Sequence, residues 1–214
     1  MIYILGAGAM ARETFSIYAD LGKLNMIGGF IEENRKSKSK IRDKHVLDAS
    51  IIKTLSKNST FIGGIGSPLR RRWIESLEEC SLQFDSAVHP SVIARESVNI
   101  GKGCIICPGA VLTCDIDIGN HNIINCNSTV HHDCKIGNFV TIGSGVNIAG
   151  NVTIADESWI GIGATIVEGV TIGKRAFIAA GAVVTKDISD DCLAMGVPAK
   201  PVRKLNESDW AGLI

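Results

Sequence analysis

The sequence has no excess of charge of either sign. Lysine and arginine together number 22, and so do aspartate and glutamate. Nucleic acids and anionic membrane surfaces attract proteins with an excess of basic residues, so this balance gives no reason to expect either partner. No apolar run approaches the length of about 18 residues that a transmembrane helix needs. The composition is consistent with a small-molecule enzyme or with a scaffold.

The sequence also lacks an export signal at its start. Its first residues, MIYILGAGAM, contain neither a basic segment nor a small-residue cleavage site. Seven cysteines, an odd number, in a chain without such a signal predict reduced thiols and a cytoplasmic location. Cys104 and Cys107 have the spacing of half a zinc site, but no second pair of similar spacing follows. We therefore expect no metal.

Residues 1–86 alternate between apolar runs and helix-like segments, which predicts an α/β domain. Three short runs predict strands, at 2–5, 26–31 and 59–66. A helix-like segment follows the first run, and a second helix is expected over 67–80, with Ser67 as its cap and Pro68 in its first turn. The polar stretch at 34–44 predicts a surface loop.

The first of these runs ends in GAGAMA, which fits the pattern G-x-G-x-x-G/A between a strand and a helix. Gly6 and Gly8 allow the backbone to approach a phosphate, and the start of the helix favours negative charge. Glu32 and Glu33 supply the acidic residue that this pattern expects at the end of the second strand. One short βαβ unit is too little for a complete NAD domain. NAD-linked chemistry and a domain that binds nothing remain as alternatives.

From residue 87 onward the sequence has a six-residue period. Every sixth residue from Ile100 to Val184 is isoleucine, leucine or valine, at 15 positions in all. A helix would need a spacing of about 3.6, whereas hexapeptide repeats are a signature of a β-helix. A near-constant Ile-Gly pair at every third repeat indicates a coil of 18 residues. Residues 87–200 are therefore predicted to form a triangular prism of parallel strands, in which residues 18 apart share a column.

The segment STVHHDCKIG places two histidines beside an aspartate. Val130 faces inward in the six-residue frame, so His131, His132 and Asp133 lie in the turn outside the prism. An imidazole titrates near neutrality, and a neighbouring carboxylate can fix its tautomer and stabilise its cation. One coil above His132 is Gly150, which leaves room for an acyl group and offers a backbone N–H to a thioester oxygen. The pattern indicates a general base; the alternative is a solvated turn without a chemical role.

Three segments, NSTVHHDCKIGNFV, AGNV and GVPAKPV, resemble the bacterial sugar-nucleotide N-acetyltransferases and sialic acid O-acetyltransferases. The resemblance covers essentially the whole chain. It implies a small N-terminal α/β (Rossmann-like) domain in residues 1–86, a left-handed parallel β-helix of hexapeptide repeats in residues 87–200 and a tail in residues 201–214. It also implies acetyl-CoA as cosubstrate, a nucleotide-linked amino sugar (UDP-, GDP- or dTDP-linked) as acceptor, and a homotrimer with sites between subunits.

The same resemblance assigns roles to individual residues. It implies His132 as the base, Asp133 as the acid that orients it, and the amide of Gly150 as the contact of the acetyl carbonyl. Coenzyme A is implied at Ile162 and Ala180. The sugar nucleotide is implied at ten positions: Gly6, Gly8, Ala9, Met10, Glu32, Glu33, Gly66, Ser67, Arg70 and Asn125.

The chain departs from the family at two of its positions. Thr141 stands where many members have a second histidine that helps bind coenzyme A, and Met10 stands where members often have a histidine near the sugar. The details of thioester binding, the identity of the sugar and the role of His131 therefore stay open. Of the other histidines, His89 is expected to be structural, while His45 and His121 are expected at the surface.

These observations predict transfer of acetyl from acetyl-CoA to the amino group of a nucleotide-linked 4-amino-4,6-dideoxyhexose. Such products feed the assembly of surface polysaccharides or glycoprotein glycans. Two alternatives remain beside the NAD-linked one: O-acetylation of a sialic acid or another hydroxyl acceptor, and a non-catalytic β-helix scaffold.

Overall fold

A computed structural model describes residues 1–33 and 40–210. Residues 34–39 of the predicted loop at 34–44 lie outside these ranges, as do the last residues of the predicted tail. The prediction of a loop is wrong at Lys40–Ile41 and at Lys44, which form an antiparallel strand pair. The chain forms two compact units, and each is described by itself. The first unit comprises Met1–Pro90 with Lys102–Ile105, and the second comprises Ser91–Gly101 with Ile106–Ile214. Among the described residues, no helix is long and apolar enough to cross a membrane.

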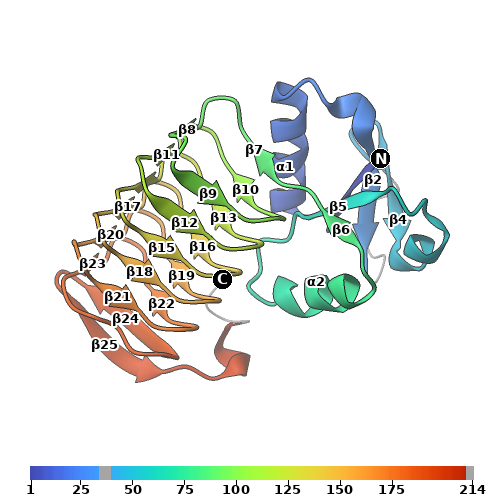
Figure 1. Ribbon diagram of the computed structural model, residues 1–214. Coiled ribbons are helices and arrows are strands. Elements are labelled where there is room, and N and C mark those ends of the chain that lie inside the picture. The colour runs from blue at the N-terminus through green and yellow to red at the C-terminus, as the bar shows by residue number, and fades with distance from the viewer. Residues whose placement is uncertain (34–39, 211–214) are drawn as a thin grey trace. The chain divides into compact units, whose positions relative to one another are not determined.

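The first unit is built on one sheet with the strand order β3-β4-β2-β1-β5-β6 (Figure 1). Its strands are β1 (Ile2–Leu5), β2 (Ile27–Glu32), β3 (Lys40–Ile41), β4 (Lys44–Asp48), β5 (Thr60–Gly63) and β6 (Gln83–Phe84). All pair in parallel except β3, which forms an antiparallel pair with β4. The carboxyl ends of β1, β2 and β5 therefore meet at one edge, where parallel α/β sheets bind ligands.

Two helices accompany this sheet, α1 (Ala9–Asp20) and α2 (Arg70–Glu79), with two short 3-10 helices, η1 (Leu24–Met26) and η2 (Ala49–Thr54). α1 is amphipathic, and its buried face includes Phe15, whose ring lies 5.7 Å from that of Phe30 on β2. α2 begins three residues later than the sequence predicts, because Ser67 forms a preceding turn in which its hydroxyl accepts from Leu69 N at 3.2 Å.

Helix α1 is also tied to the segment that leaves the sheet. The Tyr18 hydroxyl donates to Asp85 Oδ2 at 2.9 Å, and burial of the ring raises the pKa of this phenol. Further along the helix, Asp20 lies 3.1 Å from His89 Nε2. His89 thus holds the exit segment against α1, as the sequence predicts for a structural histidine.

The second unit is a prism whose coils stack one on the next (Figure 1). One sheet contains β8 (Ile93–Ala94), β11 (Val111–Leu112), β14 (Thr129–Val130), β17 (Asn147–Ile148), β20 (Thr165–Ile166) and β23 (Val183–Val184). A second contains β9 (Val98–Ile100), β12 (Ile116–Ile118), β15 (Lys135–Ile136), β18 (Thr153–Ile154) and β21 (Thr171–Ile172). The third contains β10 (Ile105–Ile106), β13 (Ile123–Ile124), β16 (Thr141–Ile142), β19 (Trp159–Ile160), β22 (Phe177–Ile178), β24 (Cys192–Gly196) and β25 (Ala199–Lys204). The preceding strand, β7 (Ala87–Val88), lies in the first unit.

The predicted columns of 18 residues are confirmed by the register of the strands. Thr129 pairs with Asn147, and Asn147 pairs with Thr165, each in parallel. Of the 15 aliphatic positions predicted to face inward, all are buried except Ile100, which is half-buried. These side chains stack in the dry interior and supply the hydrophobic stabilisation of the prism.

The C-terminal end of the prism is closed by the antiparallel hairpin β24–β25 and by the 3-10 helix η3 (Glu207–Asp209). Phe177, Leu193, Leu205 and Trp210 form a buried cluster there, with Trp159 packed against it. Strand β25 crosses the boundary predicted at residue 200.

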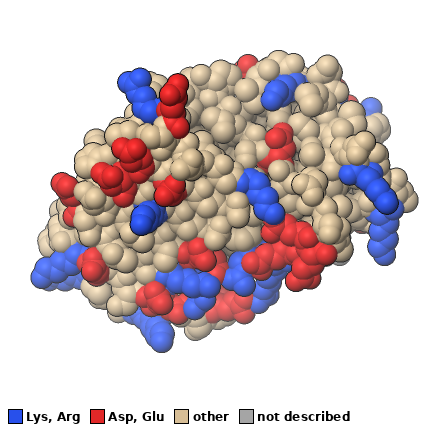
Figure 2. Space-filling view, viewed as in Figure 1, with Lys and Arg blue, Asp and Glu red and all other residues tan. Residues whose placement is uncertain are grey.

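The chain's charges are mixed on the face shown in Figure 2, where basic and acidic side chains are interspersed.

Candidate active site

The two histidines and the aspartate occupy the turn after β14. Asp133 takes a left-handed conformation with φ of 60°, as do the residues six before and six after it, Asn127 and Phe139, so this conformation belongs to the turn of the repeat. His132 Nδ1 lies 2.8 Å from Asp133 Oδ2, with about half of each side chain exposed. A carboxylate that accepts a hydrogen bond from Nδ1–H leaves Nε2 as the basic nitrogen of a neutral imidazole. The predicted base and its orienting acid therefore meet.

Gly150 lies directly against the imidazole of His132. A Cβ added to Gly150 would stand 2.6 Å from Nε2 and 2.9 Å from Nδ1, closer than real contacts allow. The two turns are also joined through the backbone, because Asn151 N donates to the His132 carbonyl at 2.9 Å. The ring can occupy its position only because residue 150 has no side chain.

Two further side chains share this column and were not singled out from the sequence. Cys114 is one coil before His132, and its carbonyl accepts from Asp133 N at 3.3 Å. Glu168 is one coil after Gly150, is exposed, and accepts from the amide of Asn151 at 3.4 Å. Counting 18 residues back from the base gives Cys114, and counting 36 residues forward gives Glu168.

The residues predicted to bind coenzyme A lie at a different corner of the prism. Ile162 and Ala180 follow β19 and β22, and both are exposed, Ile162 with 66% of its surface accessible. Asn125 is in the same row of turns, after β13, and its amide donates to the Ile142 carbonyl at 2.9 Å. These turns precede the sheet of β14, β17, β20 and β23, whereas the turn of His132 follows it. One chain therefore does not bring the two groups of residues together at one edge.

Thr141 and His121, two polar residues discussed in the sequence analysis, are buried. Thr141 on β16 is 3% exposed, and its hydroxyl has no hydrogen-bond partner among the described residues. His121 is 2% exposed and stacks on Phe139, with 4.9 Å between ring centroids. The prediction that His121 lies at the surface is therefore wrong, because residues 121 and 139 share a column and their rings pack. His45 and His131 are exposed.

The glycine-rich turn of the first unit links β1 to α1 as predicted. Gly6 has φ of 91°, a conformation that favours glycine, and its N–H donates to the Ile31 carbonyl at 2.7 Å. Gly8 precedes α1, and a Cβ added there would meet nothing within 4 Å. Glu32, half-buried, and Glu33, exposed, follow at the end of β2. This open turn gives a phosphate access to the backbone.

The loop after β5 packs against the same turn. A Cβ added to Gly64 would stand 2.8 Å from Ala11 Cα, and one added to Gly66 would stand 3.8 Å from Met10 Cβ. The predicted residues Ala9, Met10, Gly66 and Ser67 are thus neighbours at the carboxyl edge of the sheet.

Arg70 differs from its predicted neighbours because the structure buries it. Its side chain is 2% exposed, and its guanidinium lies 3.4 Å from the carbonyl oxygen of Ser67. Burial lowers the pKa of Arg70 to about 10. In this conformation the residue supports the loop from beneath and does not present its charge at the surface.

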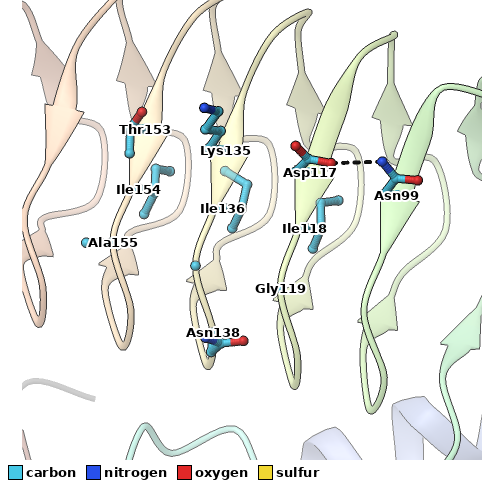
Figure 3. Close-up of a pocket in the computed structure, with 11 residues that line it drawn as sticks. Asn99, Asp117, Ile118, Gly119, Lys135, Ile136, Asn138, Thr153, Ile154 and Ala155 are labelled. Atoms are coloured by element: carbon cyan, nitrogen blue, oxygen red, sulfur yellow. Dashed lines mark hydrogen bonds between the residues drawn. The ribbon is translucent and has the colours of Figure 1, made fainter.

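A groove of about 450 Å³ follows a third part of the prism (Figure 3). Its polar side chains project from the strands β9, β12, β15 and β18, with Asn99 donating to Asp117 at 2.8 Å and Lys135 beside them. None of the predicted site residues lines this groove. Among the described residues, no three metal-ligating side chains are grouped.

Two family models match the chain. Residues 1–77 match the PglD N-terminal domain, and residues 151–186 match the bacterial transferase hexapeptide (six repeats). No curated protein matches the sequence at a significant level.

Several solved structures resemble the chain over nearly its whole length. PerB from Caulobacter crescentus in complex with CoA and GDP-perosamine is 28% identical, with a TM-score of 0.87 and coverage of 94% of this chain and 97% of that one. The acetyltransferase domain of PglB from Neisseria gonorrhoeae is 27% identical, with a TM-score of 0.86 and coverage of 94% and 98%. WeeI from Acinetobacter baumannii AYE is 28% identical, with a TM-score of 0.87 and coverage of 94% and 99%.

The prism of hexapeptide repeats, together with these similarities, defines an acyltransferase of the left-handed β-helix class that uses acetyl-CoA. Within that class the chain is similar to the solved structures above, and its first 77 residues match the PglD N-terminal domain.

Proposed function

We propose that the protein transfers acetyl from acetyl-CoA to the amino group of a nucleotide-linked 4-amino-4,6-dideoxyhexose. The observation that carries this proposal is the pair His132–Asp133 packed on Gly150, with 2.8 Å between Nδ1 and the carboxylate. Its support from outside the chain is the similarity to PerB, which was solved with CoA and GDP-perosamine.

In this reaction His132 acts as the general base. The amine attacks the thioester carbonyl carbon, a C–N bond forms, and His132 Nε2 accepts the proton that the nitrogen loses. Asp133 stabilises the resulting imidazolium, and the backbone N–H of Gly150 stabilises the oxyanion. Collapse of the intermediate breaks the C–S bond, and the proton passes to the leaving sulfur of coenzyme A.

We propose that the protein is a homotrimer and that coenzyme A binds between its subunits. Ile162 and Ala180 supply an exposed apolar column for coenzyme A. Among the described residues, the strands of the sheet between this column and the turn of His132 present only uncharged outward side chains: Ile93, Val111, Thr129, Asn147, Thr165 and Val183. In the proposed trimer, each copy faces the threefold axis with this sheet. Ile162 and Ala180 of one copy then lie next to His132 of a neighbouring copy. The arrangement would complete the site that one chain leaves divided between two corners.

In the first unit the glycine turn and α1 hold the diphosphate of the sugar nucleotide, and Glu32 or Glu33 contacts the nucleoside. Asn125 contributes to sugar binding. The reaction belongs in the cytoplasm, where acetyl-CoA is available, and its product enters the synthesis of a surface polysaccharide or glycan.

The first prediction tests the base. In a thiol-release assay with acetyl-CoA and a panel of UDP-, dTDP- and GDP-linked 4-amino sugars, His132→Asn should lower kcat by roughly 10²- to 10⁴-fold, because proton removal is lost. His131→Asn is the matched control, since this neighbour is exposed and lies outside the dyad; it should retain turnover.

Thiol release with hydroxyl acceptors alone would replace the proposal by O-acetylation. Absence of thiol release with every acceptor would overturn acetyl transfer to sugars, and full turnover by His132→Asn would overturn the assignment of the base.

A further inference from the structure

The peptide group between Ala149 and Gly150 is held at its carbonyl end by a side chain from the coil below. The Cys134 thiol donates to the Ala149 carbonyl, with 3.2 Å between Sγ and the oxygen. The N–H of the same peptide group belongs to Gly150, which is buried. In a trans peptide the C=O and the N–H lie in one plane and point in opposite directions. The bond from Cys134 therefore restrains the direction in which the Gly150 N–H points.

The peptide group between Gly137 and Asn138 has the same arrangement, but both of its ends are occupied. Its carbonyl accepts from the side-chain amide of Asn122 at 2.8 Å. Its N–H donates to Asp156 Oδ1, from the coil above, at 2.7 Å. A peptide group held at both ends has no free donor for a ligand.

The peptide group between Gly173 and Lys174 repeats this closed arrangement. The Ser158 hydroxyl donates to the Gly173 carbonyl at 2.7 Å, and the Lys174 N–H donates to Asp190 Oδ1 at 2.8 Å. Bonds from a buried side chain to a carbonyl of the next coil are thus a recurring means of fixing peptide groups in this prism.

At Gly150 the second bond is missing. The N–H of Gly150 makes no hydrogen bond to any residue that the structure describes. The side chain one coil above, Glu168, accepts instead from the amide of Asn151 at 3.4 Å. A buried N–H without a partner costs free energy, so its presence beside the imidazole of His132 indicates a ligand oxygen.

The thiol of Cys134 is suited to act as a donor. Its side chain is fully buried, and burial raises the pKa of the thiol. The group therefore keeps its proton at neutral pH, where a thiolate could only accept. Serine, a stronger donor, occupies the equivalent inward position at Ser128 and Ser158, six and 24 residues away.

We infer that Cys134 is a positioning residue, which holds the peptide group of Ala149 and Gly150 so that the Gly150 N–H faces the oxyanion. This inference rests on the proposed function, since it takes the thioester carbonyl as the ligand of that N–H. It gives an inward-facing side chain of the prism a part in acetyl transfer, through the backbone and without contact with the substrate.

The test compares Cys134→Ala with Cys134→Ser in the thiol-release assay. Cys134→Ala should lower kcat by roughly tenfold, a part of the 10²- to 10³-fold that is lost when an oxyanion donor is removed. The KM for acetyl-CoA should change by less than about twofold, because the bond acts in the transition state. Cys134→Ser still donates and should keep kcat within about threefold of the wild type.

Ser158→Ala is the matched control, because it removes the same kind of bond from a turn outside the candidate site. It should lower the Tm without lowering kcat. Alanine occupies the inward position of Cys134 in other repeats, at Ala110 and Ala164, so Cys134→Ala is expected to fold. An equal loss of kcat in Cys134→Ala and Cys134→Ser would show that packing of the sulfur matters and would overturn its role as a donor.

Infrared spectra of bound, carbonyl-labelled acetyl-CoA, recorded without an acceptor, separate this inference from the proposed function. The wild type and Cys134→Ser should lower the stretching frequency of the thioester carbonyl, and Cys134→Ala should lose part of this shift. Equal kcat in wild type and Cys134→Ala would overturn the role of Cys134 and leave acetyl transfer intact. An infrared shift that depends on Cys134, without thiol release to any acceptor, would overturn acetyl transfer to sugars and leave that role intact. Failure of acetyl-CoA to bind would overturn both.

Discussion

At the scale of single residues, the candidate site depends on what Gly150 lacks. The imidazole of His132 lies where a Cβ on residue 150 would be. Gly150 itself is outside the left-handed region, so its backbone does not require glycine. Glycine is required here because a side chain would collide with the ring. A substitution at residue 150 therefore displaces the imidazole without straining the backbone.

We predict that Gly150→Ala moves the ring of His132 and lowers kcat by roughly 10²-fold or more, because the base loses its geometry. The crowding should cost no more than about 1 kcal/mol of stability, because the half-exposed ring can turn away from the new methyl group into a less favourable rotamer. Both effects can be followed by steady-state kinetics and thermal unfolding.

The control for this prediction is Gly150→Ala in a His132→Ala background. Removing the ring leaves room for the new methyl group, so the added alanine should then change the Tm little. An equal loss of stability in both backgrounds would show that the backbone, and not the imidazole, requires the glycine.

At the scale of elements, the turns of the prism are held by side chains that bridge adjacent coils. Asn138 Oδ1 accepts from Asn120 N at 2.8 Å, and Asp156 Oδ1 accepts from Asn138 N at 2.7 Å. A Cβ on Gly119 would stand 2.7 Å from the Asn138 oxygen. The Ile-Gly pairs of the sequence thus leave space for this ladder, which satisfies backbone N–H groups that the strands leave exposed.

Near the C-terminal end of the prism, an ion pair also joins two side chains, and its contribution depends on pH. Arg175 Nε lies 2.6 Å from Asp191 Oδ1, and Nη2 lies 2.8 Å from Oδ2. The hydrogen bonds from Arg175 hold the pKa of Asp191 below its usual value. Because the pKa is lower in the folded state, the stabilisation is complete above the unfolded value of about 4 and is lost as the pH falls through the folded one.

We predict that Asp191→Asn lowers the free energy of unfolding at pH 7 by roughly 0.5–1 kcal/mol, a modest amount because both side chains are partly exposed. The difference from wild type should shrink as the pH falls below about 4. Urea unfolding at several pH values measures it. A difference that does not change with pH would mean that charge is not its origin.

At the scale of the whole molecule, the three sheets of the prism differ in what they present. Ile105, Ile123, Thr141 and Phe177 of the third sheet are buried. The second sheet is polar and carries Asp117 and Lys135 along its groove. The first sheet is uncharged and separates the two groups of site residues. These differences favour the first sheet as the surface through which copies associate.

A charge on that sheet should therefore disrupt the proposed trimer. Thr165→Glu is expected to shift the protein toward monomers in light scattering and to lower kcat/KM at least tenfold, while the fold is kept. Thr153→Glu is the matched control, because Thr153 projects from the second sheet and is exposed. A trimeric and active Thr165→Glu variant would place the interface elsewhere.

Much of the second unit could be predicted because its repeat fixes which residues are neighbours. The period of six identified the inward positions, and the period of 18 placed Gly150 against His132. The same arithmetic applied to His121 and Phe139 would have predicted their stacking. Ile100 is less buried than the other residues of its column, such as Ile118 and Ile136, because it lies near the start of the prism, where fewer coils cover it.

The sequence by itself determined the kind of fold, the pairing of His132 with Asp133 and the glycine beside the ring, because local and periodic relations decide these features. Only the tertiary structure decided that Arg70 is buried, that Met10 lies beside Gly66, and that Ile162 and Ala180 lie across a sheet from the base. These positions depend on how segments without a periodic relation pack, and on which side of each sheet a turn falls. For that reason the pairing of His132 with Asp133 could be predicted from the sequence, while the separation of this pair from Ile162 and Ala180 required the structure.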